Sequence, residues 1–203
     1  MNRRFALIAL PFILAGCASF GPSQQDAALK DHLRNPLYAE YYYDDLTEQM
    51  VTLALQENPI LQEPSIRAVV DRTRTRSLEH AALAVKAQIE GRRGNFISDR
   101  DLVAGDALLL EDILYIGPMF DAAPGPSLSM YLTTLVDPRD ATPFPDPTAV
   151  RLGGIKNQYG SQSFVVPPQP KHTGTGAGLR TAVLWDDELG TLYGFAQLTR
   201  VLP

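Results

Sequence analysis

The spacing of hydrophobic positions divides this chain into a helical half and a strand-rich half. From about Lys30 to Gly94, apolar residues recur at the spacing of one face of an amphipathic helix. From about Phe96 onward, short apolar runs are separated by turn residues, which is typical of β-strands. The pattern predicts an N-terminal α-helical region followed by an all-β antiparallel sandwich.

Two helices are expected to dominate the first half. One is predicted to begin near Asp45, because Asp45 and Glu48 form an N-terminal capping signal, and to end at Asn58 and Pro59. The other opens at Pro64, and its apolar stripe shifts along the sequence, which predicts a bend or a break near residues 74–77. The apolar positions that should each bury a face are Leu46, Met50, Leu53, Ile66, Val69, Val70, Leu78, Ala82, Val85 and Ile89.

About seven strands are predicted in the second half, with no helix between them. This arrangement favours an antiparallel sandwich or barrel. Two proline-rich loops, 137–147 and 167–178, interrupt the strands. The predicted strands are Ala107 to Leu110, Ile113 to Ile116, Leu128 to Leu135, Ala149 to Leu152, Gln162 to Val166, Thr181 to Trp185 and Thr191 to Leu198.

A short apolar segment precedes the helical region and ends at Cys17, the only cysteine of the chain. Arg3 and Arg4 precede this run, 5–15, which is shorter than the roughly 20 residues that a membrane-spanning helix needs. Together with the small residues before Cys17, the run resembles a bacterial lipoprotein signal. The alternatives are an ordinary signal peptide with a chance cysteine, or a buried N-terminal helix.

The resemblance implies that a diacylglyceryl group is added to the Cys17 thiol and that cleavage follows after Gly16. The new amino group of Cys17 is then acylated, with palmitate as the expected fatty acid. Residues 1–16 are then a signal peptide, 17–30 a tether, 31–94 a helical region and 95–203 the β-sandwich domain. Ala18 stands where an inner-membrane retention signal usually has aspartate, so we expect a bacterial outer-membrane lipoprotein that faces the periplasm. The lipid on Cys17 is the only expected contact between the protein and the membrane.

Net charge and cysteine content limit the partners and the chemistry that this protein can have. The formal net charge of −5 makes a nucleic-acid partner a poor fit. Once Cys17 is lipidated, no thiol remains for a disulfide, a metal or a nucleophile. The sequence therefore predicts no cofactor, no metal site and no catalytic residue.

Five separated blocks of the second half occur in the order seen in DM13 domains. The resemblance covers Phe96 to Pro203 and implies a β-sandwich related to DOMON domains. In that family the proposed role is electron transfer centred on a cysteine that directly follows a strand ending in tryptophan. Asp186 follows Trp185 here and occupies that position. The blocks are Gly105 to Leu110, Gly125 to Leu132, Val150 to Lys156 with Gly160 to Pro167, Ala182 to Trp185, and Leu192 to Leu198.

Other chemistry-bearing groups are interpreted as structural, with a functional alternative for each. The acids at 186–188 read as a solvated turn, with a calcium site or paired carboxylates as alternatives. Trp185 reads as a core residue instead of an electron relay or a ligand platform. The arginines at 72, 74 and 76 read as a solvated face instead of a contact for lipid phosphates. The tyrosines at 38 and 41–43 read as core packing instead of a partner surface. The remaining groups are the histidines at 32, 80 and 172, read as solvated, and the glycines at 174, 176 and 178, read as a flexible loop.

The sequence thus predicts a membrane-anchored envelope lipoprotein that is not an enzyme. Its expected role is that of a binding or structural module whose partner is an envelope protein or a small ligand. The alternative is an electron-transfer component of the DM13 type, which would use a bound cofactor or a partner's cysteine. A thiol at position 186 would favour electron transfer, whereas Asp186 favours binding.

Overall fold

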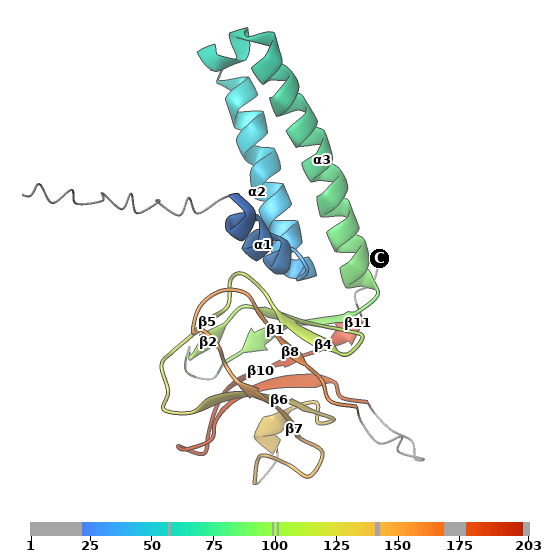
Figure 1. The fold of residues 1–203 in the computed structure, drawn as a ribbon. Helices are drawn as coiled ribbons and strands as arrows, with labels where there is room; N and C mark the ends of the chain where they lie inside the picture. The colour runs from blue at the N-terminus through green and yellow to red at the C-terminus, as the bar shows by residue number, and fades with distance from the viewer. Residues whose placement is uncertain are drawn as a thin grey trace, which may run out of the picture.

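Two parts make up the molecule, a helical arm and a β-sandwich on which the arm stands (Figure 1). The computed structural model describes residues 22–56, 58–98, 100, 102–140, 143–168 and 178–200. A helical N-terminal region followed by an antiparallel β-sheet confirms the predicted fold class. The sheet closes almost completely on itself and forms a barrel-like sandwich.

The arm consists of α2, the short 3-10 helix η1 and α3, and α1 packs beside its base. The helices span Pro22–His32 in α1, Pro36–Leu55 in α2, Pro59–Gln62 in η1 and Pro64–Ile89 in α3. The prediction that the first long helix begins near Asp45 is wrong, because Asn35 caps α2 one turn after α1 ends. The Asn35 side chain accepts a hydrogen bond from the Leu37 amide, and Pro36 occupies the first helical position, which favours a helix start.

Helix α1 lies partly within the segment that was expected to be a tether, residues 17–30. From Pro22 onward this segment is helical. Ala27, Ala28 and Leu29 are strong helix formers, which gives the segment a local preference for helix. The end of α1 is held to α2 by the His32 ring, whose centroid lies 5.3 Å from that of Tyr38.

Helix α3 is one continuous helix of 26 residues, so the predicted bend or break near residues 74–77 is wrong. The face of α3 that is buried consists of small or polar residues together with one valine: Val70, Ser77, Ala81, Ala84 and Gln88. Small side chains let the two helices of the arm approach closely. The stripe Leu78, Ala82, Val85 and Ile89, which was expected to be buried, is exposed instead.

The sheet runs in the order β7-β6-β9-β10-β1-β3-β4-β8, and β11 pairs with β1 beside it. Neighbouring strands are antiparallel. All seven predicted strands are confirmed, as β3, β4, β6, β7, β8, β9 and β10. The bounds are Arg92–Ile97 (β1), Val103–Ala104 (β2), Asp106–Leu110 (β3), Ile113–Ile116 (β4), Asp121–Ala122 (β5), Leu128–Thr133 (β6), Val150–Gly154 (β7), Gln162–Val165 (β8), Thr181–Asp186 (β9), Thr191–Gln197 (β10) and Thr199–Arg200 (β11).

The main hydrophobic core fills the inside of the sandwich. Alternate residues of β6, Leu128, Met130 and Leu132, point into it and meet Ala182 and Leu184 of β9. The other face of β6 is buried as well, because residues 143–149 pack against it, and the 3-10 helix η2 (Pro138–Asp140) lies beside them against Phe195 of β10. A smaller outer cluster therefore forms around Tyr131, Phe144, Val183 and Phe195.

Strand β1 is central to the sheet, between β10 and β3, and was not predicted. Its sequence, Arg-Arg-Gly-Asn-Phe-Ile, lacks the alternation that identifies a strand. Gly94 pairs with Ala107 of β3, while its Cα faces the backbone of Gln197 of β10. Strand β1 begins directly after α3 and so ties the arm to the centre of the sandwich.

Candidate functional site

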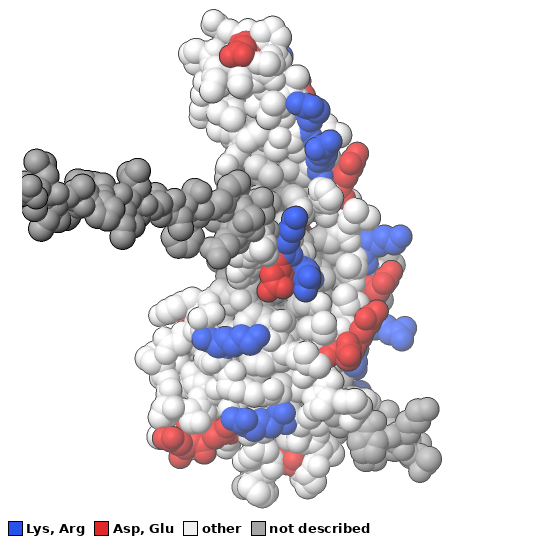
Figure 2. All heavy atoms as spheres, viewed as in Figure 1, with Lys and Arg blue, Asp and Glu red and all other residues white. Residues whose placement is uncertain are grey.

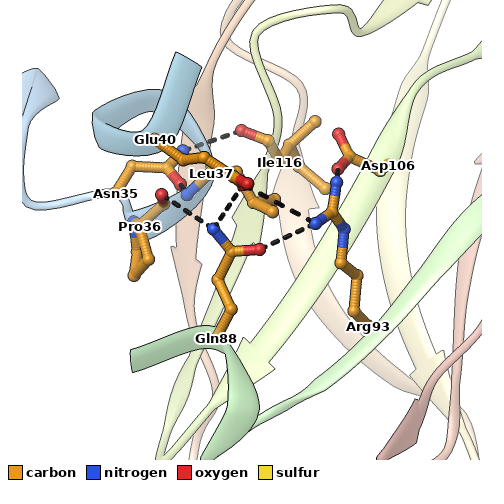
Figure 3. Close-up of polar contacts among 8 residues, drawn as sticks. All are labelled: Asn35, Pro36, Leu37, Glu40, Gln88, Arg93, Asp106 and Ile116. Carbon is orange, nitrogen blue, oxygen red and sulfur yellow. Dashed lines mark hydrogen bonds and ion pairs between the residues drawn. The ribbon is translucent and has the colours of Figure 1, made fainter. Parts of the chain in front are cut away.

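A network of polar side chains joins the base of the arm to the sandwich, and we call it the junction network. Gln88 of α3 is 3% exposed and donates hydrogen bonds to the Pro36 carbonyl oxygen (3.1 Å) and to Glu40 Oε2 (2.8 Å). Its own Oε1 accepts a bond of 2.7 Å from Arg93 of β1. One amide side chain therefore bonds α2 and β1 at the same time (Figure 3).

Arg93 extends the junction network into the sheet. Its guanidinium donates to Asp106 Oδ2 of β3 at 2.6 Å and lies 3.8 Å from Glu40 Oε2. On the other side of the arm's base, buried Asn35 donates to the Ile116 carbonyl oxygen of β4 at 2.8 Å. Because the buried polar groups are paired across the junction, the arm is held in one orientation on the sandwich.

Three members of the junction network, Glu40, Arg93 and Asp106, line a groove of about 520 Å³ between α2 and the sandwich. Five acidic residues line the groove, against one basic residue, Arg93. Its walls also carry two exposed side chains with apolar surface, Tyr41 (52% exposed) and Met119 (67% exposed). The acids are Glu40, Asp44, Asp45, Glu48 and Asp106. We call this surface the junction groove, and its electrostatics favour a positively charged partner.

Asp186, the residue that follows Trp185, is fully buried at the end of β9. Its Oδ1 accepts hydrogen bonds of 3.0 Å from the amides of Glu188 and Leu189, so it caps the turn between β9 and β10. Among the described residues its Oδ2 has no hydrogen-bond partner, and the Cα of Gly125 packs over it. The expectation of a solvated acidic turn is wrong for Asp186.

Asp187 points away from Asp186, to the outer face of the sandwich. It accepts hydrogen bonds from Ser129 Oγ (2.7 Å), Tyr131 Oη (2.6 Å) and Arg151 Nε (3.2 Å). Partial burial opposes ionisation, but these donors outweigh it and hold the pKa of Asp187 below its ordinary value. Burial and the bond to Asp187 raise the pKa of Tyr131. The adjacent acids therefore serve separate structural contacts and do not converge on one ligand.

Trp185 packs in a hydrophobic cluster, although in the smaller outer one instead of the main core. Its ring centroid lies 5.0 Å from that of Phe144. The tyrosines before the first predicted helix lie on α2 itself. Tyr43 stacks on His80 of α3 with centroids 4.8 Å apart, and Tyr38 packs against His32 of α1. Tyr41 instead is exposed and lines the groove beside the sandwich.

Four of the residues singled out from the sequence lie outside the part of the chain that the structure describes: Cys17, His172, Gly174 and Gly176. Within the part of the chain that the structure describes, no three His, Cys, Asp or Glu side chains are arranged to hold a metal ion. No helix among the described residues is long and apolar enough to cross a membrane.

The residues of the junction network were not singled out from the sequence. Only the Asn35-Pro36 pair carried a usable signal, because asparagine before proline is a typical helix start. Comparisons with protein-family models, with curated proteins and with solved structures find no match to this chain. The junction network and groove therefore have to be interpreted from their own chemistry.

Proposed function

We propose that this protein is a lipoprotein of the bacterial cell envelope, anchored through Cys17 and facing the periplasm from the outer membrane. Its arm and sandwich act as one non-enzymatic binding module, and the junction groove receives a protein partner. The observation that carries the proposal is the junction network, which fixes the arm on the sandwich beside an acidic groove.

The position of α1 supports a location close to the membrane. Helix α1 begins at Pro22, five residues after Cys17. Five residues span at most about 18 Å when fully extended. A lipid on Cys17 would therefore hold the folded part near the bilayer surface, where it meets other envelope proteins.

The junction groove supports protein binding more than small-molecule binding. It is an open surface, four of its five acids lie along α2, and Tyr41 and Met119 add apolar area. Small-molecule sites are concave and mostly apolar, whereas protein interfaces combine aromatic or methionine side chains with a charged rim. A partner with lysine or arginine side chains around an apolar patch fits this surface.

The anchor is tested by Cys17→Ser. We expect the variant to lose incorporation of labelled palmitate and to move from the membrane to the soluble periplasmic fraction, because no other lipid attachment point exists. Ser19→Ala is the matched control and should fractionate as the unsubstituted protein does. A Cys17→Ser variant that stays in the membrane with label would contradict the lipoprotein proposal.

The proposed sorting to the outer membrane is tested by a second variant. Placing aspartate directly after the lipidated cysteine, as Ala18→Asp, should retain the protein in the inner membrane. Density-gradient separation of the two membranes gives the readout.

The junction groove is tested by photo-crosslinking in cells. A benzoylphenylalanine in place of Tyr41 should give one discrete protein adduct, because Tyr41 lines the groove and is half exposed. The same residue in place of Leu189, which is 60% exposed in the turn between β9 and β10 and does not line the groove, is the control and should give none. Equal adducts from both positions, or none from Tyr41, would speak against the groove as a binding surface.

A further inference from the structure

Three arginines come together at the end of the sandwich where α3 runs into β1 (Figure 1). Arg92 of β1 lies directly opposite Arg200 of β11 in the antiparallel pairing of these strands. Arg180 directly precedes β9, and its carbonyl oxygen accepts a hydrogen bond of 2.7 Å from the amide of Leu198, two residues before Arg200. We call these three residues the arginine cluster.

Arg92 faces the inside of the sandwich. It is paired with Leu109 of β3, a member of the main core, and residues directly opposite each other on antiparallel strands share one face. Its neighbour Arg93 points to the other face, where it belongs to the junction network. Arg92 is half-buried and lies on the opposite side of β1 from the junction groove.

Arg180 and Arg200 share this inward face. Arg200 is opposite Arg92 and follows Leu198 of the main core by two residues. Arg180 precedes Ala182, another member of the main core, by two residues. Because successive side chains of a strand alternate between its faces, both arginines occupy inward positions. Both are exposed, so solutes can reach the arginine cluster.

The arginine cluster concentrates positive charge that nothing in the described part of the chain neutralises. Burial, and then the neighbouring charges of Arg200 and Arg180, lower the pKa of Arg92. Among the described residues, none of the three guanidinium groups forms an ion pair or a side-chain hydrogen bond. The folded chain therefore leaves three cations close enough to repel one another.

Two other arginines of the sandwich have acidic partners. Arg93 bonds to Asp106 at 2.6 Å, and Arg151 lies 3.1 Å from Asp187. Figure 2 shows similar mixing, with basic side chains beside acidic ones along α3 and on the lower part of the sandwich. Like charges opposite each other on antiparallel strands are destabilising, and a partly buried cation without a partner adds a desolvation cost. A bound anion would remove both costs.

We propose that the arginine cluster binds a terminal phosphate group, either free phosphate or a phosphate monoester. This site is separate from the junction groove and gives the protein a second ligand, beyond the proposed protein partner. A terminal phosphate carries more than one negative charge at neutral pH and has three acceptor oxygens, so it can pair with several guanidiniums at once. The planar fork of arginine matches these oxygens. A carboxylate has fewer oxygens and a single charge, so it would leave most of the cluster unpaired.

The surroundings of the arginine cluster limit the contact to the phosphate group itself. Its inward-facing neighbours Leu109 and Leu198 belong to the main core and are 6% and 4% exposed. The remainder of a larger ligand would therefore extend outward from the sandwich. Free phosphate meets this requirement, and so does a phosphate at the end of an envelope lipid.

The site is tested on the full chain in a neutral maltoside detergent, with inorganic phosphate as the probe. Phosphate should raise the unfolding temperature in a saturable way, and more than chloride at equal ionic strength, because it binds the folded state. The cluster variant is Arg92→Gln/Arg180→Gln/Arg200→Gln. Its apparent affinity for phosphate should fall at least about tenfold, because several charge-assisted hydrogen bonds are lost.

Two further variants separate the site from general charge. Arg76→Gln/Lys86→Gln/Arg100→Gln removes the same charge from exposed positions and should bind phosphate as the unsubstituted protein does. Arg92→Lys keeps the charge but removes the planar fork, so phosphate binding should weaken several-fold.

A lipid pair identifies the source of the phosphate. Phosphatidic acid and diacylglycerol with the same acyl chains differ only in the terminal phosphate, and each is mixed into the detergent micelles. Competition with inorganic phosphate by phosphatidic acid alone would support a lipid phosphate as the ligand. Binding of inorganic phosphate that neither lipid weakens would support a soluble phosphate at the same site.

The inference would be overturned if phosphate stabilised the protein no more than chloride, or if acetate stabilised it equally well. A cluster variant that binds phosphate as tightly as its charge-matched control would also overturn it. Without phosphate, the cluster variant should unfold at the same or a higher temperature, because repulsion is relieved. A lower unfolding temperature, with no effect of phosphate, would assign the arginines a structural role instead.

Discussion

Gln88→Ala should lower the free energy of unfolding by about 3 kcal/mol, because it leaves several buried or charged groups without partners. The lost bonds are those to the Pro36 carbonyl, to Glu40 and from Arg93. The junction network holds the arm to the sandwich, so the arm should loosen before the sheet does. Chemical denaturation gives the free energy, and amide hydrogen exchange should rise first at the start of α2.

Gln49→Ala is the matched control for this substitution. Gln49 lies on an exposed part of α2 and its side chain makes one hydrogen bond, to Asp45. Its loss should change stability by less than about 0.5 kcal/mol. If Gln88→Ala were as mild as Gln49→Ala, the junction network would not fix the arm, and the binding module would have to be described as two independent parts.

Gly94→Ala is expected to be as damaging, by about 3 kcal/mol, which is the upper end for overpacking. An added Cβ would collide with the Gln197 carbonyl oxygen and lie 2.7 Å from its carbonyl carbon. Both groups are backbone, and Gly94 is held on its other side by the β1 to β3 pairing, so neither can move aside at low cost. Thermal unfolding of the full chain measures the effect.

Gly178→Ala provides the comparison. No atom of the described residues lies within 4 Å of a Cβ added at Gly178. The substitution should be neutral or stabilise by about 0.5 kcal/mol, because it restricts the unfolded chain. A Gly94→Ala protein as stable as Gly178→Ala would mean that β1 does not pass against β10 as described.

Local signals in the sequence predicted the elements whose identity depends on local chemistry. The alternation of Leu128, Met130 and Leu132 with Ser129 and Tyr131 predicted β6 and its inward face, since a strand exposes successive side chains to opposite sides. Pro64 marked the start of α3 for a similar reason, because proline suits the first turn of a helix. Such patterns are read within a few residues and need no distant partner.

The junction network could not be predicted from local sequence patterns. Gln88, Arg93 and Asp106 carry no motif, and they come together only because α3 runs directly into β1 and β1 pairs with β3. Likewise, nothing around Asp186 signals burial, which results from its register opposite Leu128 on the inner face of the sheet.

The sequence by itself determined the division of the protein into a helical half and a strand-rich half, and the seven strands. Tertiary structure decided which face of α3 is buried, because the close approach of α2 required the small residues Ala81 and Ala84 in place of the larger Leu78 and Val85. It also made a central strand of β1, whose own sequence does not favour one, since hydrogen bonds from β3 and β10 on both sides supply the stability that local propensity lacks.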